Sequence, residues 1–205
     1  MKIYLAGPEV FLPDAAAIGQ RKRELCHRYG FEGLYPLDNE AKAEDGASLS
    51  RAIFAGNVNM IREADALVAN LTPFRGVSAD VGTVFELGFA FALSKPVFGY
   101  SNVVAALQKR VPSFLKKNKT SLGTDGRLYG SDNFAIENFG LYDNLMLVEA
   151  LIACGHDVFL PDESVTDLWH DLRTFESCLR WLAAASAKKQ NDSRSVVNSA
   201  GLLQS

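Results

Sequence analysis

One carboxylate stands out in this sequence because small and apolar residues surround it. Glu86 lies in the stretch FRGVSADVGTVFELGFAFAL, which predicts a loop that leads into a mostly apolar helix. On a helical wheel Glu86 falls about 60° to 100° from the apolar stripe. Gly82 and Gly88, which each cost about 1 kcal/mol inside a helix, leave space near it. This position suits the wall of a pocket; an ion pair with a residue such as Arg75, or a solvated carboxylate, are the alternatives, and both stay open.

The elements that must position Glu86 alternate between short apolar runs and helical patterns. Strands are expected at 3–6, 33–36, 66–71, 96–100 and 156–160, and helices at 13–29, 48–64, 80–94, 102–117, 143–154 and 165–185. The alternation predicts a single α/β domain with a doubly wound, flavodoxin-like (Rossmann-like) parallel sheet flanked by helices. This domain is expected to span residues 1–187, and the polar stretch 188–205 is expected to be a weakly ordered tail.

The loops that follow the first three strands are the candidates for a binding site. Ligands of doubly wound sheets bind beyond the carboxyl ends of the strands. These loops contain GPEVF, PLDNE and TPFRGVSAD, which are rich in Gly, Pro and polar residues. Neither GxGxxG nor GxxxxGK[ST] occurs, so a dinucleotide or nucleoside triphosphate site is disfavoured. A further stretch at 118–140 is rich in Gly, Asp and Asn, and our hypothesis is that it forms a lid over the pocket.

The composition restricts the partners of this chain of 205 residues. A net charge of −3 and a sequence pI of about 5.6 argue against a nucleic acid partner. Cys26, Cys154 and Cys178 have no CxxC spacing and predict free thiols in a reducing compartment. The histidines fit no metal-binding spacing, so neither a metal nor a cofactor is expected. The sequence has neither a signal-peptide core nor a long apolar run, so we expect a cytoplasmic protein with no membrane partner.

Five ordered blocks of the sequence match one family together. They are IYLAGPEVF, YPLDNE, NVNMIREADALVANLTPFRG, ADVGTVFELGFAFALSKP and ENFGLYDNLML, and they cover most of residues 2–160. The sequence resembles the nucleoside 2-deoxyribosyltransferases, and through FRG and DNE it looks closer to the trypanosomatid and proteobacterial-type members than to the short lactobacillal ones. The resemblance implies a glycosyltransferase of nucleotide salvage that needs no cofactor. Its substrates would be 2′-deoxynucleosides and free purine or pyrimidine bases.

The resemblance assigns catalytic roles to three residues. Glu86 matches the nucleophile that attacks C1′ and forms a covalent 2-deoxyribosyl-enzyme before a second base takes the sugar with retained configuration. Tyr4 matches the tyrosine that orients this carboxylate. Asp80 matches the aspartate that accepts a hydrogen bond from the 3′-hydroxyl of the sugar, although an aspartate at this point also suits a helix cap.

The loops after the first two strands supply the expected substrate-binding residues. Asp38, Asn39 and Glu40 match the positions that recognise the edge of the nucleobase, a task for which carboxylates and amides are suited. Gly7 and Phe11, in GPEVF, join them as candidate substrate-binding residues.

Two further residues imply an oligomer. Asn144 and Met146, in DNLM, match residues that the family sends into the pocket of the neighbouring subunit, where they contact the 5′-hydroxyl and the sugar and base. The resemblance therefore implies a homo-oligomer built on a dimer unit with a shared active site, with a tetramer or a hexamer as larger options.

The sequence departs from the lactobacillal members at Asn57. Those members have an aspartate there, which is proposed to help protonate the base, and an amide cannot donate a carboxylic proton. Asn57 stays a candidate substrate-binding residue, and Asp38, Glu40 or a water are the candidate proton donors.

Two other functions stay open. The first is a 2′-deoxynucleoside 5′-monophosphate N-glycosidase, a hydrolase that uses the same glutamate; against it, Asp143 beside Asn144 would repel a 5′-phosphate. The second is a non-catalytic protein that binds a nucleoside derivative, against which the set of Glu86, Asp80 and Tyr4 argues.

Overall fold

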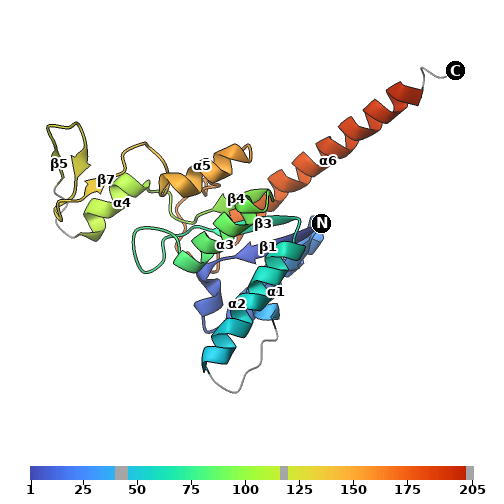
Figure 1. Ribbon diagram of the computed structural model, residues 1–205, viewed down its shortest axis with the longest axis horizontal. Helices are drawn as coiled ribbons and strands as arrows, with labels where there is room; N and C mark the ends of the chain where they lie inside the picture. Colours follow the sequence, from blue (N-terminus) through green and yellow to red (C-terminus); the bar gives the residue numbers. More distant parts are fainter. Residues whose placement is uncertain (40–45, 116–119, 202–205) are drawn as a thin grey trace.

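The centre of the molecule is a parallel sheet of four strands in the order β2-β1-β3-β4 (Figure 1). The computed structural model describes residues 1–39, 46–115 and 120–201, with side chains described for 1–39, 48–115 and 120–187. The strands are β1 (Lys2–Ala6), β2 (Glu32–Leu34), β3 (Ala66–Asn70) and β4 (Val97–Tyr100). On the central strand, Tyr4 pairs with Leu34 of β2 and Leu67 of β3. The predicted parallel α/β sheet is confirmed.

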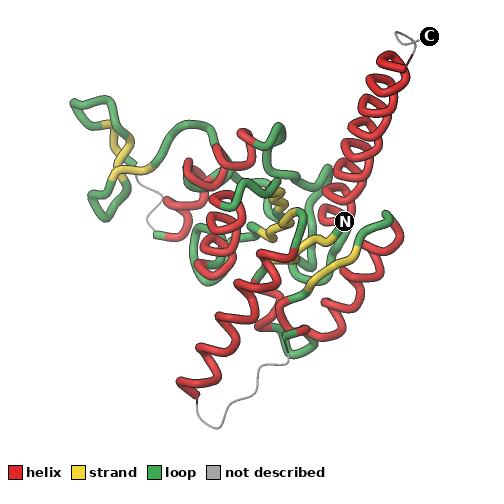
Figure 2. The backbone as a smooth tube through the Cα atoms, turned by 45° about the vertical axis from the view of Figure 1, so that its right-hand side comes forward, coloured by secondary structure: helices red, strands yellow, loops and turns green. Residues whose placement is uncertain are grey.

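Helices cover both faces of this sheet (Figure 2). Because successive strand residues point to opposite faces, Ile3 and Leu5 pack with residues of α1 and α6, whereas Tyr4 and Ala6 pack on the side of α2, α3 and α5. The helices are α1 (Ala15–Arg28), α2 (Gly46–Glu63), α3 (Val81–Ala92), α4 (Leu107–Phe114), α5 (Leu145–Ala153) and α6 (Arg173–Gly201), and the short 3-10 turns are η1 (Pro8–Phe11) and η2 (Pro36–Asp38). A doubly wound domain is the result.

The C-terminal part differs from the sequence expectation. The expected strand at 156–160 is reduced to one parallel bridge between Phe159 and Tyr100. The closing helix begins at Arg173 instead of 165, because the Asp167 carboxylate accepts hydrogen bonds from two backbone amides in a turn that precedes the helix. The helix then continues past the expected end at 185 to Gly201, into the stretch expected to be a tail.

The stretch at 118–140 is not one long loop. It contains a small antiparallel sheet of β5 (Ser121–Leu122), β6 (Leu128–Tyr129) and β7 (Ala135–Ile136). Its role as a lid stays a prediction. Among the described residues, no helix has the combined length and apolarity that crossing a bilayer requires.

The cysteines are free thiols, as predicted. Cys26 and Cys178 are buried and Cys154 is half-buried.

Candidate active site

Three elements bring side chains together at Glu86. Glu86 projects from α3, Tyr4 from β1 and Asn57 from α2. The Tyr4 hydroxyl donates a hydrogen bond to Glu86 Oε1 at 2.6 Å, and Asn57 Nδ2 donates to the same oxygen at 3.4 Å. The Arg75 guanidinium lies over two phenylalanine rings instead of pairing with Glu86. Of the readings that the sequence left open, the pocket wall is therefore the one that the geometry supports.

Burial controls the protonation of Glu86. Desolvation raises the pKa of Glu86 from 4.5 to about 7; the hydrogen bonds from Tyr4 and Asn57 oppose this rise, and the negative charge of Asp80 adds to it. Burial, together with the charge of Glu86, raises the pKa of the Tyr4 hydroxyl far above its ordinary value, so the hydroxyl stays protonated and able to donate. A carboxyl group that titrates near neutral pH inside a pocket is typical of catalytic residues.

Asp80 caps the helix that carries Glu86. Its Oδ2 accepts hydrogen bonds from the Thr83 backbone nitrogen at 3.0 Å and from the Thr83 hydroxyl at 3.2 Å. These bonds satisfy a backbone donor at the start of α3, as the sequence predicted. Both of them use the same carboxylate oxygen, so Oδ1 is the atom with which Asp80 can accept from a ligand hydroxyl.

A pocket of about 410 Å³ opens beside Glu86, a volume within the range of small-molecule sites. Its lining combines carboxylates and amides with apolar residues of η1, η2 and α2. The lining residues are Gly7, Val10, Phe11, Pro36, Leu37, Asn39, Ile53, Asn57, Asp80, Gly82, Thr83 and Glu86. Such a lining suits a ligand that has both hydrogen-bonding groups and an apolar ring.

Two glycines preserve the shape of this pocket. A Cβ on Gly7 would lie 2.1 Å from Oε2 of the buried Glu9, so only glycine fits there without a shift. A Cβ on Gly56 of α2 would lie 2.0 Å from Asn39 Nδ2. Gly56 therefore makes room for Asn39, whose amide donates to the Ile53 carbonyl at 3.0 Å.

The structure brings most of the predicted site residues to one place. Those that line the pocket or contact Glu86 are Tyr4, Gly7, Phe11, Asn39, Asn57, Asp80 and Glu86. Asp38 does not line it: its carboxylate forms an ion pair with Arg23 and accepts a hydrogen bond from the Tyr35 backbone nitrogen at 2.9 Å. Glu40 lies outside the described residues.

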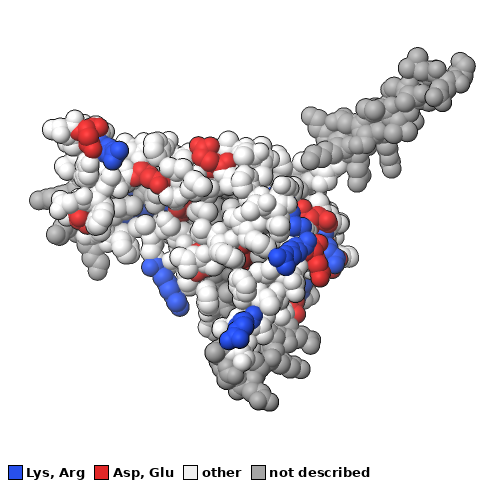
Figure 3. All heavy atoms as spheres, in the orientation of Figure 1, with Lys and Arg blue, Asp and Glu red and all other residues white. Residues whose placement is uncertain are grey.

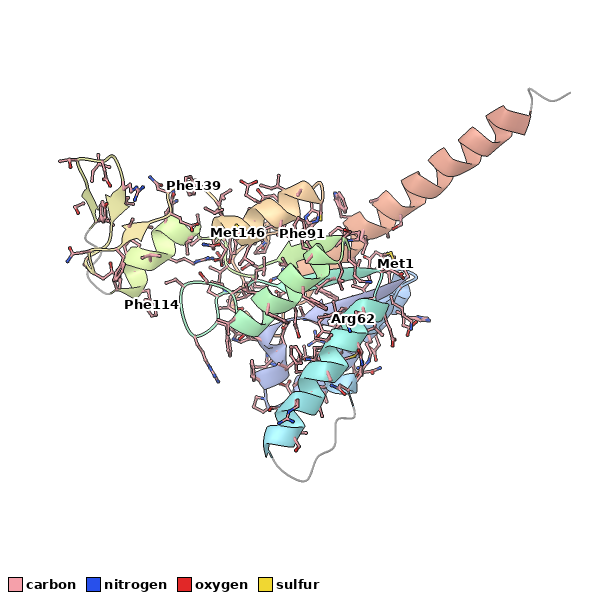
Figure 4. The ribbon with its side chains drawn as sticks, in the orientation of Figure 1. Met1, Arg62, Phe91, Phe114, Phe139 and Met146 are labelled. Atoms are coloured by element: carbon pink, nitrogen blue, oxygen red, sulfur yellow. The ribbon has the colours of Figure 1, made fainter. Side chains whose placement is uncertain are left out.

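Asn144 and Met146 lie on a different element, α5. Asn144 caps this helix: its Oδ1 accepts from the Met146 backbone nitrogen at 3.1 Å and its Nδ2 donates to Glu137 Oε1 at 2.6 Å. The Met146 side chain is 73% exposed (Figure 4). Neither residue lines the pocket of its own chain, so a contact with a pocket would require a second chain.

Sequence reasoning missed part of the apolar wall. Leu37 and Ile53 line the pocket, and both are exposed large hydrophobic residues. The available signals were positional. Leu37 directly precedes Asp38 in PLDNE, and Ile53 lies one helical turn before Asn57, on the same face of α2.

An apolar surface extends over α2 and α3. Phe54 and Phe85 are 56% and 53% exposed, and the ring centroid of Phe85 lies 6.1 Å from that of Phe54 and 6.2 Å from that of Phe89. On the face drawn in Figure 3, charged side chains are scattered between wide uncharged areas. Exposed aromatic clusters of this kind are typical of protein interfaces.

Comparisons with known proteins show which family this chain resembles. The model of the family described as nucleoside 2-deoxyribosyltransferase matches residues 3–146. The chain is similar to an uncharacterized protein of Schizosaccharomyces pombe, with 28% identity over 193 residues that cover 89% of this chain and 88% of that protein. It is also similar to the solved structure of a 2-desoxiribosyltransferase from Leishmania mexicana, with 31% identity, a TM-score of 0.60, and coverage of 89% of this chain and 97% of that chain.

Proposed function

This chain belongs to the nucleoside 2-deoxyribosyltransferase family, and we propose that it transfers the 2-deoxyribosyl group between nucleobases through a covalent intermediate on Glu86. The observation that carries this proposal is the hydrogen bond of 2.6 Å from Tyr4 to Glu86 at the wall of the pocket. It combines a nucleophile with a group that orients it, which is the arrangement that covalent catalysis requires.

In the first displacement, ionised Glu86 attacks C1′ of a 2′-deoxynucleoside and the C1′–N bond to the base breaks, with its electron pair leaving on the base. The transition state resembles an oxocarbenium ion, which a nearby carboxylate stabilises. Tyr4 binds one oxygen of Glu86, so the other oxygen is the one that attacks. Asp80 Oδ1 accepts a hydrogen bond from the 3′-hydroxyl of the sugar. A ring nitrogen of the second base then attacks C1′, the C1′–O bond to Glu86 breaks with its electron pair returning to the carboxylate, and the incoming base loses its N–H proton.

The departing base needs a proton, and Asn57 cannot supply it from an amide. In this chain Asn57 donates to Glu86 instead, which favours the ionised nucleophile. Asp38 is poorly placed for the task because its carboxylate is paired with Arg23 outside the pocket lining. The proposal therefore assigns this proton to Glu40 or to a water molecule.

We also propose that two subunits complete each active site. Asn144 and Met146 do not line the pocket of their own chain, and the exposed rings of Phe54 and Phe85 offer an apolar area for a second chain to cover. In this arrangement Asn144 reaches the 5′-hydroxyl of the partner's substrate. Sedimentation velocity tests the association: a monomer at micromolar concentration would contradict it.

The main alternative is the hydrolysis of 2′-deoxynucleoside 5′-monophosphates. Asp143 does not disfavour this substrate as the sequence suggested, because its carboxylate is buried and paired with Arg110 at 2.9 Å, so its charge is compensated. Glu137 is the carboxylate that disfavours this substrate. It accepts hydrogen bonds from Asn144 Nδ2 and from the Leu145 backbone nitrogen, and it has no cationic partner among the described residues. A carboxylate beside Asn144 disfavours a 5′-phosphate by charge repulsion.

The test is incubation with deoxyinosine, with and without adenine, followed by chromatography. Deoxyadenosine that forms only with adenine and only when Glu86 is intact supports transfer. Release of hypoxanthine without deoxyadenosine would indicate hydrolysis. If deoxyinosine stays intact, the same experiment with deoxyinosine monophosphate separates the nucleotide hydrolase from a protein that only binds its ligand.

A further inference from the structure

A stack of aromatic rings continues the apolar wall of the pocket into the C-terminal part of the chain. Phe11, which lines the pocket and is 58% exposed, stacks on Phe74 with ring centroids 5.5 Å apart and planes at 12°. Phe74 and Trp169 form a T-shaped pair with ring centroids 6.0 Å apart and planes at 87°. These three rings come from η1, from the loop between β3 and α3, and from the segment before α6.

The Arg75 guanidinium makes cation–π contacts with the rings of Phe11 and Phe74. The Arg75 guanidinium lies 4.8 Å from the centroid of Phe74 and 5.7 Å from that of Phe11. Arg75 has a φ of 52°, a left-handed conformation that non-glycine residues adopt at a cost. Such a conformation persists where surrounding contacts hold it. We therefore interpret the Phe11–Phe74 stack, with Arg75 over it, as a fixed arrangement beside the pocket.

The segment that carries Trp169 is fastened on both sides. The buried Asn102, in the loop after β4, donates hydrogen bonds from Nδ2 to the carbonyls of Leu168 at 2.8 Å and Asp171 at 2.9 Å. On the other side, His170 Nε2 lies 3.1 Å from Oδ2 of Asp14. Asp14 stands immediately before α1 and three residues after Phe11. These contacts therefore tie the segment of Trp169 to the short connection between η1, which carries Phe11, and α1.

From this geometry we propose that Trp169 is a positioning residue for substrate binding: acting through Phe74, it holds the Phe11 ring in the orientation that accepts the nucleobase. This inference rests on the proposed function. Phe11 belongs to a 3-10 turn of four residues, and its stack on Phe74 is its one ring-to-ring contact among the described residues. Without Trp169, Phe74 loses its edge contact, and both rings gain freedom that binding must then remove.

The expected effect falls on binding and not on the chemical step. One aromatic contact of this kind changes an equilibrium by about 2- to 10-fold. Trp169→Ala should therefore raise the KM for deoxyinosine by about 3- to 10-fold and leave kcat within about twofold, because Glu86 and Tyr4 are untouched. Trp169→Phe keeps an aromatic edge on Phe74 and should restore most of the affinity.

Trp181 provides the matched control. It is the second tryptophan of the chain, and its ring packs on Phe98 and His156, away from the residues that line the pocket. Trp181→Ala removes a ring of the same size and should lower stability without changing KM. The inference would be overturned if both variants raised KM by the same factor, or if neither variant changed KM.

A fluorescence titration provides a readout that loss of stability does not produce. In a protein with Trp181→Phe and Glu86→Gln, Trp169 is the one remaining tryptophan and the nucleoside is not consumed. Its emission should change with deoxyinosine and saturate, and unchanged emission at a concentration that saturates the enzyme would contradict the inference. If the unaltered protein exchanges no base, the proposed function falls and this inference falls with it; normal exchange with an unchanged KM in Trp169→Ala overturns the inference alone.

Discussion

Replacement of the buried nucleophile should stabilise the protein while it abolishes activity. Glu86 is a carboxyl group whose pKa rises from 4.5 to about 7 on folding, mainly because it is buried. Above pH 7 Glu86 is ionised in both states. In the folded protein the ionised carboxylate is desolvated, which costs free energy, whereas in the unfolded chain it is hydrated. Each pH unit between the two pKa values corresponds to 1.36 kcal/mol, so the penalty is about 3 kcal/mol. Glu86→Gln keeps the shape of the side chain and removes this penalty.

The sign of the effect depends on pH in a defined way. Between pH 4.5 and 7 the unfolded chain has lost the proton and the folded protein retains it, so the stability of the unaltered protein falls as pH rises through this window. Glu86→Gln lacks this dependence. The variant should therefore be more stable by about 3 kcal/mol at pH 8, and the difference should shrink toward zero near pH 4.5.

The assay is urea unfolding of both proteins from pH 4.5 to 8 at one protein concentration, since an oligomer gains stability with concentration. Thermal unfolding at pH 8 should show a gain of about 6 to 12 °C for a chain of this size. Glu149→Gln, at an exposed position on α5, is the control for the removal of one negative charge. Equal stability at pH 8, or a gain that does not vary with pH, would refute the account of Glu86.

Four further predictions concern the same site. Tyr4→Phe removes a hydrogen bond to a carboxylate and should lower kcat/KM by about 10- to 100-fold and shift the rise of kcat/KM with pH to higher pH; an unshifted profile would count against the orienting role. Asn57→Asp places a second carboxylate beside Glu86 Oε1, so activity should appear only at higher pH than in the unaltered protein, as a pH–rate profile will show. Asp80→Asn should keep the cap of α3, with a change in unfolding free energy below about 0.5 kcal/mol, and lose activity, whereas Asp80→Ala should also lose about 1 kcal/mol of stability. Co-refolding of Glu86→Gln with Met146→Glu subunits should restore about a quarter of the wild-type activity, because each mixed dimer regains one intact site; no recovery would contradict a shared site.

The positions of the first four strands and the class of the fold follow from local sequence patterns. The runs at 3–6 and 66–71 are mostly apolar because both faces of these strands are covered, with the buried Asn70 as the polar exception, and Gly, Pro or Asp residues lie near their ends. The C-terminal boundaries are less predictable because they depend on contacts between distant residues. Asn102 donates hydrogen bonds to the carbonyls of Leu168 and Asp171, which lie 66 and 69 residues further along the chain. A short window of the sequence cannot contain both partners.

Some features of the site also follow from local sequence patterns, whereas others depend on residues far apart in the sequence. The position of Glu86 at the edge of an apolar stripe is visible in the pattern of one helix. Its partner Tyr4 lies 82 residues away, and only the family resemblance named it in advance. The ion pair of Asp38 with Arg23 joins two side chains that each look available in the sequence. The compensation of Asp143 by Arg110 is of the same kind. Charge neutralisation is a property of three-dimensional neighbours, so sequence reasoning overstates the number of free carboxylates.

The covalent intermediate is the central claim, and its capture tests it most directly. The protein is mixed with deoxyinosine in the absence of an acceptor base, quenched in acid, digested and analysed by mass spectrometry. The account predicts one 2-deoxyribosyl group on the peptide that contains Glu86, and its loss, with formation of deoxyadenosine, when adenine is added before the quench. Base exchange without any adduct, or an adduct on another residue, would contradict it.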